Sequence, residues 1–219
     1  MAKRLFDFVV ALAGLIALGP VMALLALAVK LDSPGPAFYK GRRIGRDGVP
    51  FGMYKLRTMA HHADRMGSAV TRGQDPRVTR VGRLLRKSKL DELPQLANVL
   101  RGEMSLVGPR PEAPCYVAYY TPQQREALRV RPGITGLAQI HFRNEEALLQ
   151  GCDDLEREYV TKVMPLKLSF DLEYIRRRSF WLDLRLIWRT AACLCARGDA
   201  MQQALPAFAP EAGGIEHPA

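Results

Sequence analysis

An adjacent pair of carboxylates, Asp91 and Glu92, lies at the centre of residues 86–112 and is the part of the chain best suited to chemistry. A dense run of cations precedes the pair. Two acids in that setting suit a carboxylate nucleophile or a metal-bridged phosphate site. The plain alternative is structural, because acidic and hydroxyl side chains commonly cap helices, and Ser88 or Asp91 would cap one here.

The residues that follow the pair predict a helix. Apolar side chains recur at helical spacing at Leu93, Leu96, Val99 and Leu100. Pro94 is tolerated in a first helical turn and Gly102 is a common residue just past a helix end. We therefore expect a helix that starts within residues 90–93 and ends at Arg101. The two carboxylates would lie at the positive end of its dipole, where they stay ionised and where a phosphate can bind.

A second feature, the turn Gly108-Pro109-Arg110-Pro111, favours function for this region. Its two prolines fix the position of Arg110, whose planar guanidinium suits a phosphate. A surface loop rarely needs two prolines around one cation.

The elements that must position these groups begin with a β-hairpin. Residues 37–44 and 50–57 read as two short strands around a turn at residues 45–48. Lys55 and Arg57 share one face of the second strand by the period of two, so together they suit a diphosphate. From the spacing alone, a solvated strand face is an equally good interpretation.

Amphipathic helices are the next expected elements. Arginines recur every third residue, at Arg77, Arg80, Arg83 and Arg86, and predict a basic helix that lies against anionic headgroups. Residues 153–175 predict a helical stretch, and residues 180–188 predict a helix whose tryptophans suit a membrane interface or the protein core. Residues 60–76 predict a mobile loop, and residues 198–219 predict a disordered tail.

The N-terminal segment has no charged residue from Phe8 to Val29, which is long enough for a membrane helix. Gly19-Pro20 divides it into halves of about ten residues, each about half a bilayer core in length. Basic residues flank both ends, whereas a spanning helix has a richer positive flank on one side only. We therefore expect a re-entrant helix–break–helix, with a simple span as the alternative.

Composition narrows the partners of this 219-residue chain. The formal net charge of +10 implies an anionic partner, such as nucleic acid, an anionic membrane face or a nucleotide sugar. The four cysteines form no CxxC pair and no histidines cluster with them, so the sequence predicts no zinc site.

Three motifs in order resemble the bacterial sugar transferases, the monotopic phosphoglycosyl transferases that start glycoconjugate assembly on polyprenol phosphate. They are SPGPAFYKGRRIGRDGVPFGMYKLRTM at residues 33–59, LDELPQLANVLRGEMSLVGPRP at 90–111 and RPGITGLAQ at 131–139. The resemblance spans roughly residues 3–197. Two departures stand out: Gly19-Pro20 replaces the family's frequent Ser-Pro, and Ile140-His141-Phe142 replaces its common Asn-Gly, before Arg143-Asn144 resumes the pattern.

The resemblance implies roles for individual residues. Asp91 would be the nucleophile and a magnesium ligand, and Glu92 would hold the site or accept a proton. Lys55, Arg57, Arg86 and Arg110 would bind substrate phosphate. The loop of Arg131, Pro132, Gly133, Thr135 and Gly136 would face the nucleotide.

The resemblance also implies the reaction and the place. A phosphosugar would pass from a nucleoside diphosphate sugar, such as a UDP-sugar, to polyprenol (undecaprenyl) phosphate through a covalent aspartyl intermediate, with Mg²⁺ as cofactor. The chain would sit in the bacterial inner membrane, with both termini and the catalytic domain in the cytoplasm. Interfacial proteins of this size often associate, so a homodimer is left open.

The expected fold is α+β and mostly helical, with a membrane-anchoring segment at 1–32, a catalytic domain at 33–197 and a tail at 198–219. Two other functions compete with catalysis. A membrane-anchored adaptor explains the hydrophobic segment and the basic stripe, but not the acid pair or the double-proline turn. A nucleic-acid-binding protein explains the charge, but the arginines lie beside membrane-seeking stretches without a stacking platform, so we expect no nucleic acid.

Overall fold

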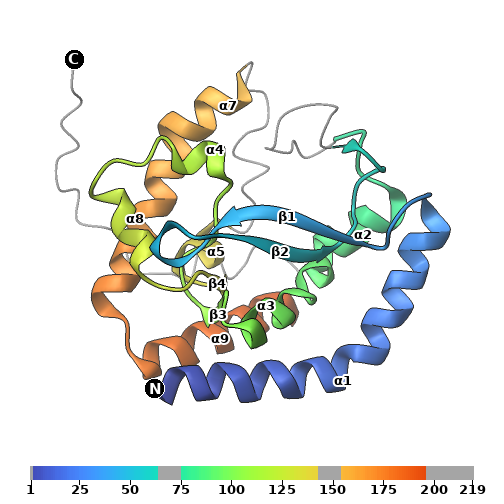
Figure 1. Ribbon diagram of the computed structural model, residues 1–219, viewed down its shortest axis with the longest axis horizontal. Helices are drawn as coiled ribbons and strands as arrows, with labels where there is room; N and C mark the ends of the chain where they lie inside the picture. The colour runs from blue at the N-terminus through green and yellow to red at the C-terminus, as the bar shows by residue number, and fades with distance from the viewer. Residues whose placement is uncertain (1, 64–74, 143–153, 196–219) are drawn as a thin grey trace.

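A computed structural model describes residues 2–63, 75–142 and 154–195 of the chain, and Figure 1 shows its ribbon. The predicted tail, most of the predicted mobile loop, and Arg143-Asn144 lie outside the described residues. In the first half, the elements are α1 (Ala2–Asp32), β1 (Phe38–Ile44), η1 (Arg46–Gly48), β2 (Pro50–Leu56), α2 (Arg80–Ser88), η3 (Leu90–Glu92), α3 (Gln95–Arg101) and β3 (Ser105–Val107). In the second half, they are α4 (Pro114–Val117), η4 (Gln124–Arg129), β4 (Gly133–Thr135), α5 (Leu137–His141), α7 (Leu155–Glu158), η5 (Tyr159–Val163), α8 (Met164–Arg177) and α9 (Phe180–Cys195). The expected class is confirmed: the chain is mostly helical with small sheets.

Helix α1 is a single element that runs through Pro20, and its ribbon bends about midway along its length (Figure 1). Proline removes one backbone hydrogen bond and crowds the preceding turn, which accounts for a bend without a break. By length and composition alone, α1 is apolar enough to cross a membrane. Its exposed apolar side chains include Leu5, Ile16, Leu24 and Leu31. Such a surface suits lipid, whereas the direction of each end stays a prediction.

The N-terminal end of α1 is attached to the rest of the protein by polar contacts. Arg4 donates to the carbonyl oxygens of Val99 and Leu100, at 2.6 and 2.8 Å, where α3 ends. Lys3 Nζ lies 2.6 Å from a carboxylate oxygen of Asp183 on α9.

A buried acid adds a further attachment within the first half of α1. The Asp7 side chain is 2% exposed and accepts a hydrogen bond of 2.8 Å from the Ser105 hydroxyl on β3. Buried charges persist only when they are bonded in this way, so α1 is docked in a defined position.

The other end of α1 is held from β2. The Arg57 guanidinium donates to the carbonyl oxygens of Ser33 and Pro34, at 2.7 and 2.8 Å, and to the Ser33 hydroxyl. Gly35, with φ at +114°, lies so close to this guanidinium that a Cβ would clash with it. Arg57 is itself buried, so it fastens the turn that leaves α1 to the hairpin.

The predicted hairpin is confirmed: β1 and β2 pair antiparallel, with Tyr39 opposite Lys55. The turn is a short 3-10 element in which Asp47 and Gly48 have positive φ. In Figure 1, the hairpin crosses the molecule between α1 and α4. Strand β2 ends at Leu56, and Arg57 lies just past it, where its amide still donates to the Ala37 carbonyl at 2.8 Å.

The region around the acid pair differs from the predicted continuous helix. Asp91 and Glu92 lie in the 3-10 turn η3, and α3 begins only at Gln95, after Pro94. Neither helix start has a side-chain cap, so the expected capping by Ser88 or Asp91 is wrong. The predicted end is confirmed, since α3 stops at Arg101 and Gly102 has a φ of +81°.

The basic helix is shorter than predicted: it begins at Arg80 with Thr79 as its cap, and Arg77 instead pairs with Asp75. The two C-terminal helical stretches are confirmed as α7 to α8 and as α9. Their buried side chains join α3, β3 and α5 in a core that contains Val99, Met104, Leu137, Phe170 and Leu186. This core packs against α3, the helix that follows the acid pair. The division at residue 32 stays a prediction.

Candidate active site

Asp91 is buried, with 5% of its surface exposed, at the junction between η3, β2 and the turn after β3. Lys55 Nζ lies 3.9 Å from its Oδ2, and among the described residues its buried Oδ1 has no hydrogen-bond partner. Burial raises the pKa of Asp91, and the charge of Lys55 opposes that rise. An unsatisfied buried carboxylate is costly to keep, and such groups concentrate at functional sites.

Glu92, unlike Asp91, is bonded to two cations that lower its pKa. Its Oε1 accepts a hydrogen bond of 2.9 Å from Lys55 Nζ and one of 2.7 Å from Arg110 Nη2, and its Oε2 lies 3.4 Å from Arg110 Nη1. Burial alone would raise the pKa of Glu92, but Arg110 and Lys55 together hold it well below its usual range. Glu92 is therefore ionised and tied to two cations.

Four elements bring these groups together. Strand β2 contributes Lys55, η3 contributes both acids, α2 contributes Arg86, and the turn after β3 contributes Arg110. Arg86 Nε donates to the Thr58 hydroxyl at 2.9 Å, and its charge acts on Asp91. The structure thus gathers Lys55, Arg86 and Arg110 around the acid pair, as the sequence predicts, while their contacts with substrate stay predictions.

Two predicted phosphate or nucleotide ligands point elsewhere. The Arg57 guanidinium is bonded at the end of α1, and Arg131 Nε donates to the Gly102 carbonyl at 2.8 Å, beyond the end of α3. Both arginines therefore fasten backbone in this structure. Their positions give no support to the predicted roles in binding substrate.

The predicted nucleotide-facing loop supports the double-proline turn. Strand β4 pairs parallel with β3, and the amide of Gly133 donates to the Pro109 carbonyl at 2.8 Å. A Cβ at Gly133 or Gly136 would overlap backbone atoms of Gly108, so these glycines permit a close approach of two chains. A nucleotide contact for this loop, with Pro132 and Thr135, stays a prediction.

Asn98, which the sequence analysis missed, links α3 to the strand that contributes Lys55. Its side chain accepts from the Tyr54 amide at 3.0 Å and donates to the Gly52 carbonyl at 2.8 Å and to Glu103 at 2.6 Å. Asn98 is fully buried. The only signal in the sequence was a polar residue between the apolar positions of a helix.

Lys89 is a second residue that the sequence analysis missed. It lies between α2 and η3 in the left-handed backbone region, with φ at 58°, and its side chain is exposed. The Glu92 amide donates to its carbonyl oxygen at 3.2 Å, so Lys89 forms the turn that presents the acid pair.

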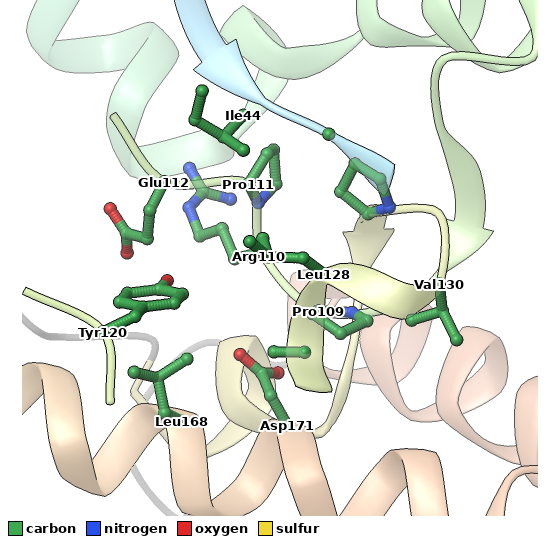
Figure 2. Close-up of a pocket in the computed structure, with 13 residues that line it drawn as sticks. Ile44, Pro109, Arg110, Pro111, Glu112, Tyr120, Leu128, Val130, Leu168 and Asp171 are labelled. Atoms are coloured by element: carbon green, nitrogen blue, oxygen red, sulfur yellow. The ribbon is translucent and has the colours of Figure 1, made fainter. Parts of the chain in front are cut away.

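A small pocket lies behind the double-proline turn, and Figure 2 shows Arg110 and Glu112 on one side of it, with Tyr120 and Asp171 facing them. Glu112 accepts hydrogen bonds from the Tyr159 hydroxyl at 2.6 Å and from Lys167 Nζ at 3.2 Å. Burial raises the pKa of Asp171 to about 8. These polar groups and the double-proline turn line the same pocket.

The side chains at this site could bind a magnesium ion only if the substrate supplied further ligands. Among the residues that the structure describes, no three His, Cys, Asp or Glu side chains cluster as a metal site. Magnesium in phosphate-processing sites often binds through one or two carboxylates, substrate phosphates and water. The unbonded Oδ1 of Asp91 is one such donor.

Comparison with known proteins gives consistent matches. A family model described as bacterial sugar transferase matches residues 1–197. The UDP-glucose:undecaprenyl-phosphate glucose-1-phosphate transferase of Caulobacter vibrioides is 44% identical over 204 residues, which cover 91% of this chain and 72% of the relative. The protein of the same name in Escherichia coli is 42% identical over 194 residues, which cover 87% of this chain and 39% of the relative. The exopolysaccharide production protein ExoY of Rhizobium meliloti is 38% identical over 210 residues, which cover 89% of this chain and 86% of the relative.

Proposed function

The chain belongs to the bacterial sugar transferase family, and from that premise we propose that it transfers a phosphosugar from a UDP-sugar to undecaprenyl phosphate. The single observation that supports this most is Asp91, a buried carboxylate with one unbonded oxygen, placed beside Lys55 and the cations around Glu92. The names of the Caulobacter and Escherichia relatives make UDP-glucose the first sugar nucleotide to test. Because the chain spans about two fifths of the Escherichia relative, the activity of the whole relative is carried over only as part of this proposal.

The proposed reaction is two successive displacements at one phosphorus atom. A carboxylate oxygen of Asp91 attacks the phosphorus that bears the sugar, and the bond from that phosphorus to the bridging oxygen breaks. Uridine monophosphate leaves with the bridging oxygen and its electron pair. A phosphate oxygen of undecaprenyl phosphate then attacks the same phosphorus, which releases the Asp91 carboxylate and forms undecaprenyl diphosphate sugar.

The environment of each acid suits a different part in this reaction. Burial without a hydrogen bond leaves an Asp91 oxygen available to attack, and removing water strengthens its interaction with nearby charges. Glu92 is a poor proton acceptor, since its pKa is held well below the usual range. We assign Glu92 the task of holding Lys55 and Arg110 in position, where they bind phosphate oxygens.

Magnesium is part of the proposal as the partner of Asp91 and the substrate diphosphate. Bound there, the ion would neutralise phosphate charge that otherwise repels an anionic nucleophile. Asp91 is the described residue that would hold it.

Helix α1 supports a membrane location for the proposed reaction. Its exposed apolar surface suits one leaflet, and its bend at the proline suits a re-entrant path in the inner membrane. With both ends on the cytoplasmic side, the soluble sugar nucleotide and the lipid phosphate would meet at Asp91. In this proposal, the first membrane step of exopolysaccharide or glycoconjugate assembly takes place at the cytoplasmic leaflet.

The test of the proposed function uses full-length protein in lipid nanodiscs, with undecaprenyl phosphate and magnesium. Mixing with UDP-glucose should release uridine monophosphate, and Asp91→Asn should abolish both that release and an acid-labile adduct made with radiolabelled sugar. Membrane binding of the variant should be unchanged. Turnover by Asp91→Asn at a large fraction of the wild-type rate would contradict the assignment of the nucleophile, and a panel of other UDP-sugars would identify the donor if UDP-glucose is inactive.

A further inference from the structure

Lys89 occupies a backbone conformation that lysine does not favour. With φ at 58° and ψ at 15°, it ends α2 and begins η3. Glycine is the usual residue at such a helix end, and asparagine also tolerates it, because a longer L side chain is disfavoured there. Lysine at position 89 is therefore less favourable for stability than glycine would be. What lysine adds to the turn is its side chain.

The ammonium of Lys89 belongs electrostatically to the active site. Desolvation, followed by repulsion from Arg110, lowers the pKa of Lys89, while Glu92 and Asp91 act in the opposite direction. The Glu92 amide donates to the Lys89 carbonyl at 3.2 Å, so the residue lies beside the acid pair, and the charges of that pair act on its ammonium. The Lys89 residue is exposed at the surface, although neighbouring groups partly desolvate its ammonium, so solvent and substrate can reach it.

The neighbouring cations are already engaged by the protein. Lys55 and Arg110 both bond Glu92, and Arg86 bonds Thr58. Within the described part of the chain, the Lys89 ammonium has neither a hydrogen bond nor an ion pair. It is thus a cation at the site whose donors are all available to an incoming ligand.

The charge of the cluster indicates the kind of ligand. Lys55, Arg86, Lys89 and Arg110 face two carboxylates, so positive charges exceed negative ones by two. A nucleoside diphosphate sugar has one negative charge on each of its two phosphates, so the positive excess of the cluster attracts it, and any bound magnesium ion adds to that attraction. Removing Lys89 takes one positive charge from the cluster and so weakens its attraction for a diphosphate.

We propose that Lys89 is a further substrate-binding residue, whose ammonium binds a phosphate oxygen of the sugar nucleotide's diphosphate. This assignment rests on the proposed function, because it supposes that the acid pair receives such a diphosphate. The lipid phosphate has the same chemistry, and the kinetic experiment below separates the two.

The decisive variants are Lys89→Gly and Lys89→Asn, since both suit the left-handed backbone and remove the ammonium. We expect the Tm of each variant to equal or exceed that of the wild type, while KM for UDP-glucose rises about tenfold, the effect of one charge-assisted hydrogen bond in a partly solvated site. Lys89→Arg should stay within about threefold of the wild-type KM, because it keeps the charge. Lys87→Ala, an exposed lysine two residues earlier on α2, is the matched control and should change neither quantity.

A binding measurement makes the result independent of turnover. Titration of uridine diphosphate into full-length protein in nanodiscs should give a Kd about tenfold weaker for Lys89→Gly than for the wild type. A shift of less than twofold in both Kd and KM would overturn the role of Lys89, as would an equal shift in Lys87→Ala.

A rise confined to KM for undecaprenyl phosphate would overturn the choice of the diphosphate. If the wild type binds uridine diphosphate through Lys89 yet transfers nothing from any UDP-sugar, the proposed function fails and the binding role stands.

Discussion

At the scale of single residues, the pKa values of two adjacent carboxylates are shifted in opposite directions by their surroundings. Asp91 is buried with an unbonded oxygen, and burial raises its pKa. Glu92 is buried next to two bonded cations, which hold its pKa well below the usual range. Pairs separated in this way commonly divide the work of a site between them. Here Asp91 keeps an oxygen without a hydrogen bond, and Glu92 holds Lys55 and Arg110 in position.

The raised pKa of Asp91 predicts an acid limb in the rate of the first displacement. The carboxylate form is required, so the rate should fall as pH falls through that pKa, above the ordinary range for aspartate. Lys55 is the strongest charge that opposes the rise, so Lys55→Gln should move the limb to higher pH. Single-turnover formation of the labelled adduct across pH measures this, with Lys87→Gln as control. A limb that stays in place or moves to lower pH would contradict the assignment.

The types of residue at the site were predictable from the sequence, but their burial and pairing were not. The double-proline turn correctly singled out Arg110 as a fixed cation, and Lys55 follows from strand alternation. The alternation did not predict the position of the Arg57 side chain, because its guanidinium is bonded to the turn after α1. Such long-range contacts leave no local pattern in the sequence.

At the scale of elements, the hairpin and the acid-bearing segment are joined by Asn98. Its amide satisfies backbone groups of Gly52 and Tyr54 on β2, so the strand that presents Lys55 keeps its distance from α3. Helix spacing predicted the apolar side of α3 and its end at Gly102. It could not predict the interruption after Glu92, because a 3-10 turn and an α-helix place apolar residues at similar intervals.

Asn98→Ala should lower the free energy of unfolding by about 2–3 kcal/mol, because it leaves a buried amide and a buried carbonyl without partners. The Lys55 ammonium should also lose its fixed position, so kcat should fall as well. Denaturation in detergent, compared with Arg125→Ala at an exposed position on η4, measures the first effect. Stability within about 0.5 kcal/mol of the wild type would show that other contacts hold the strand.

Asp171 predicts a pH dependence of stability within α8. Burial raises its pKa to about 8, so between about pH 4 and that value the folded protein holds a proton that the unfolded chain has lost. The free energy of unfolding therefore falls as pH rises through this window. Asp171→Asn removes this contribution, and its Tm should exceed that of the wild type most clearly at and above about pH 8. A Tm difference that is the same at about pH 5 and about pH 8 would contradict the raised pKa.

At the scale of the whole molecule, an apolar helix and a charged site share one small chain. Sequence composition predicted both, since a charge-free N-terminal run and a formal net charge of +10 are visible without any structure. The bend of α1 was foreseen from Gly19-Pro20, although the helix proved continuous through Pro20 instead of broken. Neighbouring turns retain enough hydrogen bonds to keep such a helix whole.

The re-entrant path predicts the side on which the N-terminus lies. Ala2→Cys, in a variant whose four native cysteines are replaced, should react with a membrane-impermeant maleimide in inverted inner-membrane vesicles and not from the periplasmic side of intact cells. A cysteine placed in the exposed turn at Asp47 should react from the same side and serves as the control. Labelling of the N-terminus from the periplasm, with Asp47→Cys still reacting from the cytoplasm, would establish a spanning helix.

Helix α1 is fastened at both of its ends, by Arg4 to the end of α3 and by Arg57 to the turn at Ser33 and Pro34. Those same two elements, α3 and β2, flank the acid pair. In the proposed re-entrant position, α1 would therefore fix the height of the reactive carboxylate above the acyl chains, because these contacts hold both ends of the helix. Bilayer thickness then becomes a variable of catalysis, and lipids with longer or shorter tails would raise or lower the reaction centre relative to the headgroup it must meet.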